Sequence, residues 1–345
     1  VISLFATSNK SYIFLPCSAI SFSVLKKFIR LSGCIVCLAA LALIAAKPEI
    51  YLKSAGDGLK LWALSVVPSL LPFFFLTTLA SSLGLTSALA KILEKPFGAL
   101  FRLRGACAYA FVSSVISGYP TGAKTIASLA EEGFITADEA TRASTLCSTS
   151  GPSFVIGFIG ATAFKNKTAG YAILLSHIVS AVLCGMAFRF YGKYERRDNR
   201  PIQSRNLDNA LYECAYTSVV AVAVVGAFVC VFFTLCEAAV NLNLTEPLSR
   251  ALYALTRDET VARGVSEGII ECTRGCRKIA ESGLTRLSVS ACAGVISFGG
   301  ISVFAQSLAF LKKANANAAI FCLSKAVQSA VGFSVCYLAF PLFFA

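Results

Sequence analysis

The sequence predicts an all-α polytopic membrane protein built from two inverted repeats, each with a broken or re-entrant helical hairpin. Of its 345 residues, 56% are hydrophobic and only 14% are charged, whereas about 25% of the residues of a soluble globular domain are charged. Several long stretches contain no Asp, Glu, Lys or Arg. Two of these stretches carry glycine-rich interruptions, one in each half of the chain.

The formal net charge of +13 comes from 31 Lys and Arg against 18 Asp and Glu. Proteins that bind nucleic acid gather basic residues in dense patches, whereas here these residues lie between apolar runs. The chain is also too apolar for a disordered protein and too long for a disulfide scaffold. We therefore expect the lipid bilayer and no nucleic acid as a partner, and the sequence leaves a homo-oligomer open.

A helix that spans a bilayer needs about 20 apolar residues. Charge-free stretches that can serve as spans or interrupted spans lie at 31–46, 61–90, 105–123, 143–164, 168–188, 214–236, 287–311 and 326–345. Residues 1–30 are predicted to be an N-terminal extension. A basic cluster follows the apolar stretch there, whereas it precedes the apolar region of a signal peptide.

The basic residues of short loops predict the orientation of the spans. The linker over 192–207 is predicted to be cytoplasmic because it carries Lys193, Arg196, Arg197, Arg200 and Arg205. It separates a first repeat over 31–191 from a second repeat over 208–345. Segment 237–286 is then predicted to lie on the outer side.

The two halves echo each other in the order of their elements. Val115-Ile116-Ser117 precedes one interruption and Val295-Ile296-Ser297 precedes the other, so we predict re-entrant hairpins over 105–132 and 284–312. The orientation above makes corresponding helices run in opposite directions, which predicts inverted repeats. Paired interruptions of this kind indicate the binding site of a transporter.

The first interruption contains the candidate substrate-binding residues Ser117, Gly118, Tyr119, Pro120, Thr121 and Gly122, followed by Lys124. A broken helix at membrane depth survives only where it is buried in protein or lines a cavity, and the amides at a helix N-terminus attract anions. Lys124 lies in the first turn of the next helix, where a cation opposes the helix dipole by about 0.3–1 kcal/mol. We expect Lys124 to meet a substrate carboxylate; the alternatives are a position at the membrane surface or an acidic partner.

Further candidate substrate-binding residues are Thr149, Ser150 and Ser153 in the first half and Gly299, Gly300, Gln306 and Lys325 in the second. The small residues among them equally suit close helix packing, and Lys325 equally suits the membrane interface. The single histidine, His177, is predicted to be packed and hydrogen-bonded rather than part of a proton relay. The sequence lacks a zinc motif, a Walker loop and a GxSxG elbow, so we expect no metal, no cofactor and no enzyme.

The segment Ser117–Lys124, with the letters SGYPTGAK, resembles the sporulation integral membrane proteins of the YlbJ type, in the nucleoside-recognition Gate domain superfamily. Val67–Phe73, Ser150–Gly157 and Phe298–Gly300 with Gln306 support the resemblance, which covers about residues 30–345. One departure is Ser148–Gly151, where the family is expected to carry asparagine.

The resemblance implies a fold similar to the concentrative nucleoside transporters, with a transport domain that moves against a scaffold. It also implies a role in sporulation, in which dipicolinic acid moves from the mother cell across the outer forespore membrane. Such a small aromatic dicarboxylate suits two helix N-termini, Lys124 and stacking on Tyr119. The alternatives are a cation-coupled nucleoside transporter and a spore-envelope scaffold that transports nothing.

Overall fold

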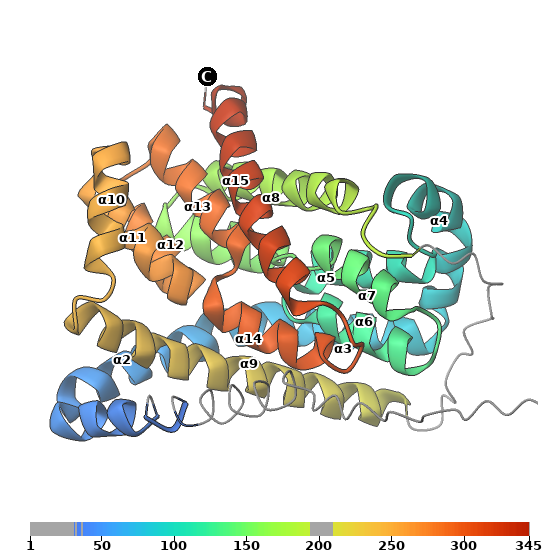
Figure 1. Cartoon of the computed structure of the whole chain (residues 1–345), viewed down its shortest axis with the longest axis horizontal. Helices are drawn as coiled ribbons and strands as arrows, with labels where there is room; N and C mark the ends of the chain where they lie inside the picture. The colour runs from blue at the N-terminus through green and yellow to red at the C-terminus, as the bar shows by residue number, and fades with distance from the viewer. Residues whose placement is uncertain (1–30, 32, 36, 194–209, 345) are drawn as a thin grey trace, which may run out of the picture. The chain divides into compact units, whose positions relative to one another are not determined.

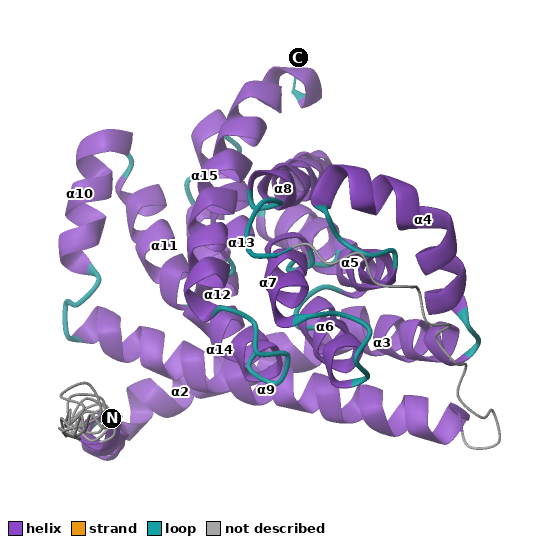
Figure 2. Cartoon of the chain, turned by 45° about the vertical axis from the view of Figure 1, so that its right-hand side comes forward, coloured by secondary structure: helices purple, strands orange, loops and turns teal. Residues whose placement is uncertain are grey.

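The computed structural model describes residues 31, 33–35, 37–193 and 210–344. Every regular element among these residues is a helix, which confirms the predicted all-α class (Figures 1 and 2). The chain divides into a unit over Val1–Glu49 and a larger unit over Ile50–Ala345. The predicted extension over 1–30 and all but two residues of the predicted linker over 192–207 lie outside the described residues.

The smaller unit contributes a short apolar helix over Gly33–Ala46. Helix α2 (Pro48–Leu61) crosses the boundary at Glu49. The first half of the larger unit continues with the π-helix η1 (Trp62–Val66), α3 (Val67–Ser82), α4 (Leu85–Phe101), α5 (Ala106–Ser117), α6 (Thr121–Glu131), α7 (Ala137–Leu146), the π-helix η2 (Ser153–Ala163) and α8 (Lys167–Ala187). Helix α7 begins at a capping box, in which Thr136 and Glu139 satisfy each other's backbone amides. Asn166 caps α8.

The second half contains α9 (Ala210–Asn241), α10 (Glu246–Thr256), α11 (Glu259–Ile270), α12 (Cys272–Ala280), α13 (Arg286–Phe298), α14 (Gly300–Leu311) and α15 (Ala318–Phe343). The side chains of Asp258, Thr285 and Asn317 accept backbone hydrogen bonds at the starts of α11, α13 and α15. Each of these helices therefore begins at a residue that satisfies its free amides.

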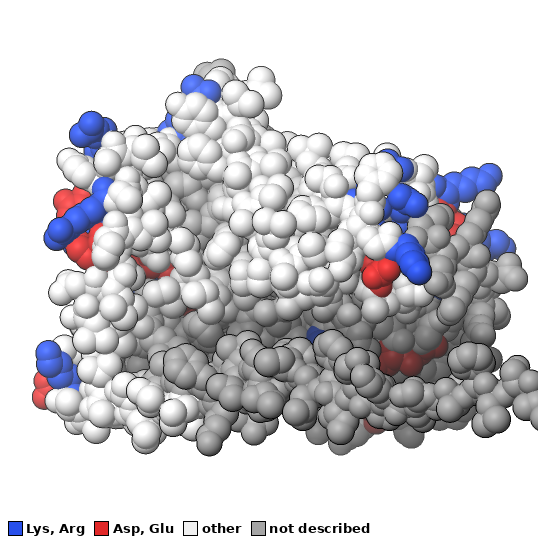
Figure 3. Space-filling model, viewed as in Figure 1, with Lys and Arg blue, Asp and Glu red and all other residues white. Residues whose placement is uncertain are grey.

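Five helical runs among the described residues are long and apolar enough to cross a membrane: Pro48–Ser82, Lys167–Ala187, Leu211–Asn241, Arg286–Leu311 and Ala318–Phe343. A sixth is possible if α4 and α5, which meet at 89°, act as one broken span. On the face shown in Figure 3, charged side chains gather near α10 at one end and near α4 at the other, and few charged side chains are visible in the wide band between them. The protein is a multi-pass membrane protein, as predicted.

The predicted span over 143–164 is interrupted within 147–153, as its glycine, proline and hydroxyl residues predict. Helix α7 ends at Leu146, residues 147–151 have no helical structure, and η2 begins at Ser153. Gly151-Pro152 explains the interruption, because proline disfavours a helical conformation for the residue before it.

Two pairs of helices fold back on themselves. A Cβ placed on Gly122 of α6 would lie 2.8 Å from the Cβ of Ser114 in α5. If the two residues belonged to one continuous helix, their eight-residue separation would place them about 12 Å apart along its axis. In the same way, a Cβ on Gly275 of α12 would lie 2.5 Å from the Gly268 nitrogen of α11. The chain therefore turns back both between α5 and α6, inside the predicted hairpin over 105–132, and between α11 and α12.

The second predicted hairpin, over 284–312, differs in the structure. Helices α13 and α14 together form one candidate span, Arg286–Leu311, that is interrupted at Gly299 and does not fold back. The folded-back pair of the second half lies upstream, in α11 and α12. Three glycines, Gly264, Gly268 and Gly275, allow these two helices to approach each other closely.

The described residues of the larger unit form three buried apolar clusters. One is formed by α3 and α9, with Leu70, Phe74, Val225 and Phe233 among its members. The other two are built mainly from α4–α8 and from η2, α8 and α11–α15. The pair α3 and α9 therefore forms a layer with its own apolar contacts, distinct from the layer of folded-back and interrupted helices.

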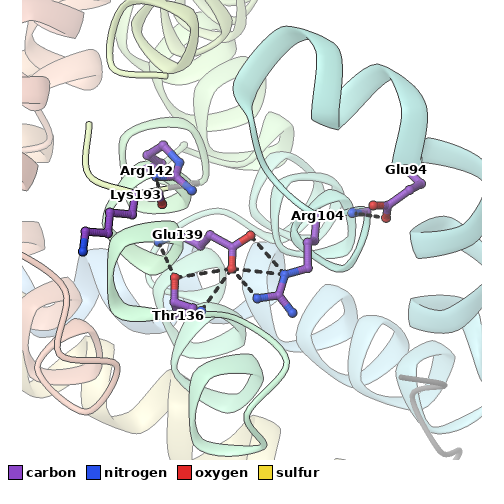
Figure 4. A network of polar contacts seen from close by, with 7 residues as sticks. Glu94, Arg104, Thr136, Glu139, Arg142 and Lys193 are labelled. Carbon is purple, nitrogen blue, oxygen red and sulfur yellow. Dashed lines mark hydrogen bonds and ion pairs between the residues drawn. The ribbon is translucent and has the colours of Figure 1, made fainter. Parts of the chain in front are cut away.

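A buried ion pair holds the first folded-back pair in place (Figure 4). The Arg104 guanidinium donates to both carboxylate oxygens of Glu139, with 3.1 Å from Nε to each oxygen, and Glu139 is fully buried. Glu139 also closes the capping box of α7. The pair thus joins the start of α5 to α7, and removing either partner would leave an uncompensated buried charge.

Candidate functional site

The tip of the α5–α6 pair packs against the interruption between α7 and η2. Gly118 has a φ of +81°, a backbone conformation that glycine adopts without strain. A Cβ on Gly118 would lie 2.6 Å from the Gly151 nitrogen. Only glycine therefore fits this contact between the two broken segments.

The second half repeats this arrangement. Gly299 and Gly300, with φ of +89° and +79°, separate α13 from α14. A Cβ on Gly300 would lie 3.0 Å from the Gly268 oxygen and 3.2 Å from the Cys272 nitrogen, at the tip of the α11–α12 pair. Each half therefore packs the tip of a folded-back pair against an interrupted helix.

Hydrogen bonds link the two halves at these breaks. The Tyr119 hydroxyl donates to the Ile296 carbonyl at 2.7 Å. The His177 Nε2 accepts from the Ser150 amide at 2.9 Å, and Nδ1 lies 2.9 Å from the Ser297 hydroxyl. Because a backbone amide can only donate, Nε2 carries no hydrogen, and a neutral ring donates through Nδ1. The prediction of a packed, hydrogen-bonded His177 is confirmed.

A small, partly open cavity lies where the breaks meet the α3–α9 layer, with room for about 60 Å³ of water-sized content. The end of η1 contributes Val66, and helices α3 and α9 contribute Ser69, Leu70, Val225 and Val229. In and beside the first-half breaks, Gly118, Tyr119, Ser150, Gly151 and Phe154 line the cavity. The second half contributes Glu271, Cys272, Thr273, Ser302, Val303 and Gln306.

Four of the predicted site residues line this cavity: Gly118, Tyr119, Ser150 and Gln306. Others pack around them: Ser117, Pro120, Gly122, Thr149, Gly299, Gly300 and Lys325 are buried, and Thr121 and Ser153 are half-buried. Lys124 is half-buried in α6 and does not belong to the cavity lining among the described residues.

Glu271 is a cavity residue that the sequence analysis does not predict. It separates α11 from α12, is buried, and its Oε2 accepts the Arg274 amide at 2.7 Å as the cap of α12. An acidic residue three positions before a helical amide is a recognisable cap signal. That signal is weak here because Glu271 lies among the many charged residues of 237–286.

Charges of both signs face the cavity. Residues in or next to the first turns of η2, α12 and α14 line it, and helix N-termini carry partial positive charge that attracts anions. The Glu271 carboxylate adds a full negative charge if it is ionised. Among the described residues, no group of three or more His, Cys, Asp and Glu side chains could hold a metal ion.

Comparison with known proteins adds two findings. Residues 63–167, from η1 to the start of α8, match the Gate family, which is described as nucleoside recognition. The chain is also 26% identical over 313 residues to the sporulation integral membrane protein YlbJ of Bacillus subtilis (strain 168), covering 83% of this chain and 77% of that protein. The predicted resemblance is confirmed. No solved structure matches the chain.

The Gate match covers the α5–α6 pair and the α7–η2 interruption, and so includes the first-half wall of the cavity. The similarity to YlbJ extends over most of the chain. These findings support a sporulation-related, multi-pass membrane protein.

Proposed function

We propose that the protein is a secondary transporter of a small anionic metabolite, dipicolinic acid, which it moves from the mother cell across the outer forespore membrane. The observation that carries the proposal is the cavity, because broken segments from both halves of the chain line it together with α3 and α9. Interrupted helices around a central cavity are typical of secondary transporters.

Alternating access follows from the two layers. We propose that the folded-back and interrupted helices form two inverted repeats, in an arrangement similar to concentrative nucleoside transporters, and that they move as a body against α3 and α9. Such movement has to break contacts between the layers, including the bond from the Tyr109 hydroxyl to the Thr77 carbonyl at 2.6 Å and the ion pair between Arg274 and Glu237 at 2.8 Å.

Dipicolinate suits several groups of the cavity. Its ring can stack on Tyr119, its carboxylates can accept from amides at the helix N-termini, and the Gln306 amide can donate to it. The Gln306 Nε2 already donates to the Ser302 hydroxyl at 3.3 Å, a bond that a solute carboxylate can replace. Because Glu271 would repel a dicarboxylate, we infer that the two share a proton when the solute is bound.

A nucleoside is the second candidate solute, and Glu271 is the observation that favours it. A buried carboxylate accepts hydrogen bonds from ribose hydroxyls, and the Gln306 amide can pair with a base edge. The spore-envelope scaffold is less favoured, because a scaffold needs no cavity between its layers.

The deciding experiment measures the uptake of labelled dipicolinate and labelled uridine by liposomes that contain the purified full chain, with sodium and proton gradients imposed separately. We expect saturable uptake of dipicolinate above that of protein-free liposomes, and no such uptake of uridine. Uptake of uridine alone would favour the nucleoside transporter. Uptake of neither would favour the scaffold.

A further inference from the structure

Lys325 of α15 is fully buried behind the cavity wall. Its Nζ donates to the Ser148 carbonyl at 2.9 Å and to the Gln328 Oε1 at 2.7 Å, and lies 5.4 Å from the centre of the Tyr119 ring. Lys325 takes part in no ion pair among the described residues. The partners of its ammonium are therefore two amide oxygens and an aromatic face, the surroundings of a bound cation.

The position of the Ser148 carbonyl explains why a cation suits this contact. Ser148 lies just beyond the C-terminal end of α7, in the interruption before η2. Carbonyls at the end of a helix lack intrahelical partners and carry partial negative charge. In transporters with broken helices, such carbonyls coordinate the coupling cation. Here the carbonyl is already occupied by an ammonium of the chain itself.

A second observation points to the same place. The Ser148 Oγ and the Gln328 Nε2 are buried and have no hydrogen-bond partner within the described part of the chain. The Ser148 hydroxyl is thus an additional oxygen beside the carbonyl that Lys325 contacts. Removal of the ammonium would leave up to three oxygens, from Ser148 and Gln328, and oxygen atoms are the ligands of hard cations. Because these three oxygens are uncharged, we expect a small monovalent cation such as sodium in place of the ammonium.

Lys325 is also screened from the solute. Tyr119 lines the cavity and Lys325 does not, while the ammonium lies within cation–π distance of the Tyr119 ring. Lys325 therefore supports the wall of the solute site through Tyr119, while its predicted contact with the solute stays a prediction.

We propose that the Lys325 ammonium acts as a tethered cation at the first interruption, so that solute movement requires no sodium ion. The effect on solute flux rests on the proposed transport function, whereas the cation site itself can be tested without any solute. Lys325 is therefore a positioning residue: its ammonium fixes the conformation of the α7–η2 interruption, which forms part of the cavity wall.

The first test measures the melting temperature of the purified full chain in detergent, without solute, in equal concentrations of sodium chloride, methylammonium chloride or choline chloride. The wild type should melt at the same temperature in all three. Lys325→Ala should melt lower in choline and rise by about 2–4 °C in sodium or methylammonium, because a cation that binds only the folded state stabilises it. Lys313→Ala, which removes an exposed lysine between α14 and α15, should melt at the same temperature in the three salts.

A sodium-dependent rise in the wild type would overturn the proposal, and that measurement does not require the variant to fold. The proposal also fails if Lys325→Ala folds but gains nothing from either small cation. Lys325→Gln, which keeps the bulk of the side chain without its charge, provides the same comparison if the alanine variant does not fold.

The second test repeats the salt comparison on dipicolinate uptake by liposomes. Wild-type uptake should be equal in sodium and choline. Uptake by Lys325→Ala should fall about tenfold or more in choline, because two buried acceptors lose their donor, and should recover with sodium or methylammonium. A wild type that requires sodium contradicts the proposal. If no solute moves in any salt, the proposed transport function fails, while the melting comparison still decides the role of Lys325.

Discussion

Glu271 is the residue on which the choice between the two candidate solutes depends. Its carboxylate lines the cavity and caps α12 through the Arg274 amide, and glutamine can accept the same hydrogen bond. If dipicolinate is the solute, Glu271→Gln should bind it as tightly or more tightly, because a like charge is removed. If a nucleoside is the solute, the loss of a charged acceptor should weaken binding by about tenfold or more.

Ligand-induced melting shifts of the purified variant, with dipicolinate and uridine side by side, measure this difference. Glu281→Gln is the matched control, because Glu281 is exposed just beyond the end of the same helix. Dipicolinate binding that weakens in Glu271→Gln but not in Glu281→Gln would contradict the proposed repulsion between the Glu271 carboxylate and the solute.

Individual cavity residues differ in how far the sequence predicts them. Gly118, Tyr119 and Ser150 are predictable, because glycine, proline and hydroxyl residues inside an apolar run indicate a break. Glu271 cannot be singled out from the sequence, because it lies among many other charged residues in its segment. The contact between Lys325 and Ser148 joins positions 177 residues apart, and no local pattern carries that information.

At the scale of elements, the α5–α6 pair depends on close packing at Gly122. A Cβ at this position would overlap the Cys147 carbonyl and lie 2.8 Å from the Cβ of Ser114. Gly122→Ala should therefore lower the free energy of unfolding by about 1–3 kcal/mol through overpacking. The expected fall in melting temperature is about 2–4 °C for each kcal/mol.

Gly157→Ala in η2 is the matched control, because a Cβ there meets no atom within 4 Å. It should leave both the melting temperature and dipicolinate uptake close to those of the wild type. Equal melting temperatures for Gly122→Ala and Gly157→Ala would show that the tip of the α5–α6 pair is not tightly packed.

The sequence predicts the existence of broken segments better than their geometry. The glycines that interrupt α13 and α14 are visible in the sequence, but glycine alone does not distinguish a sharp return from an interrupted span. The return between α11 and α12 depends on glycines of two helices meeting each other, Gly268 and Gly275. These lie in segment 237–286, which the sequence predicts to lie on the outer side and for which it predicts no broken helix.

For the whole molecule, the proposed function requires solute to pass between the α3–α9 layer and the broken helices. Val229 of α9 lines the cavity and is 6% exposed, whereas Val231 on the same helix is 53% exposed. Val229→Trp should fill the cavity and abolish dipicolinate uptake by liposomes, and its melting temperature beside that of the wild type checks that the variant remains folded. Val231→Trp should retain uptake.

The same pair of variants tests the scaffold alternative in cells. When either variant replaces the relative of this chain in a sporulating bacterium, the transport proposal predicts spores poor in dipicolinate only for Val229→Trp. A scaffold that transports nothing would tolerate a filled cavity, because its contacts with partners lie on its surface. If spores that carry a stable, correctly inserted Val229→Trp protein contain a normal amount of dipicolinate, the cavity is not the solute path and the transport proposal is wrong.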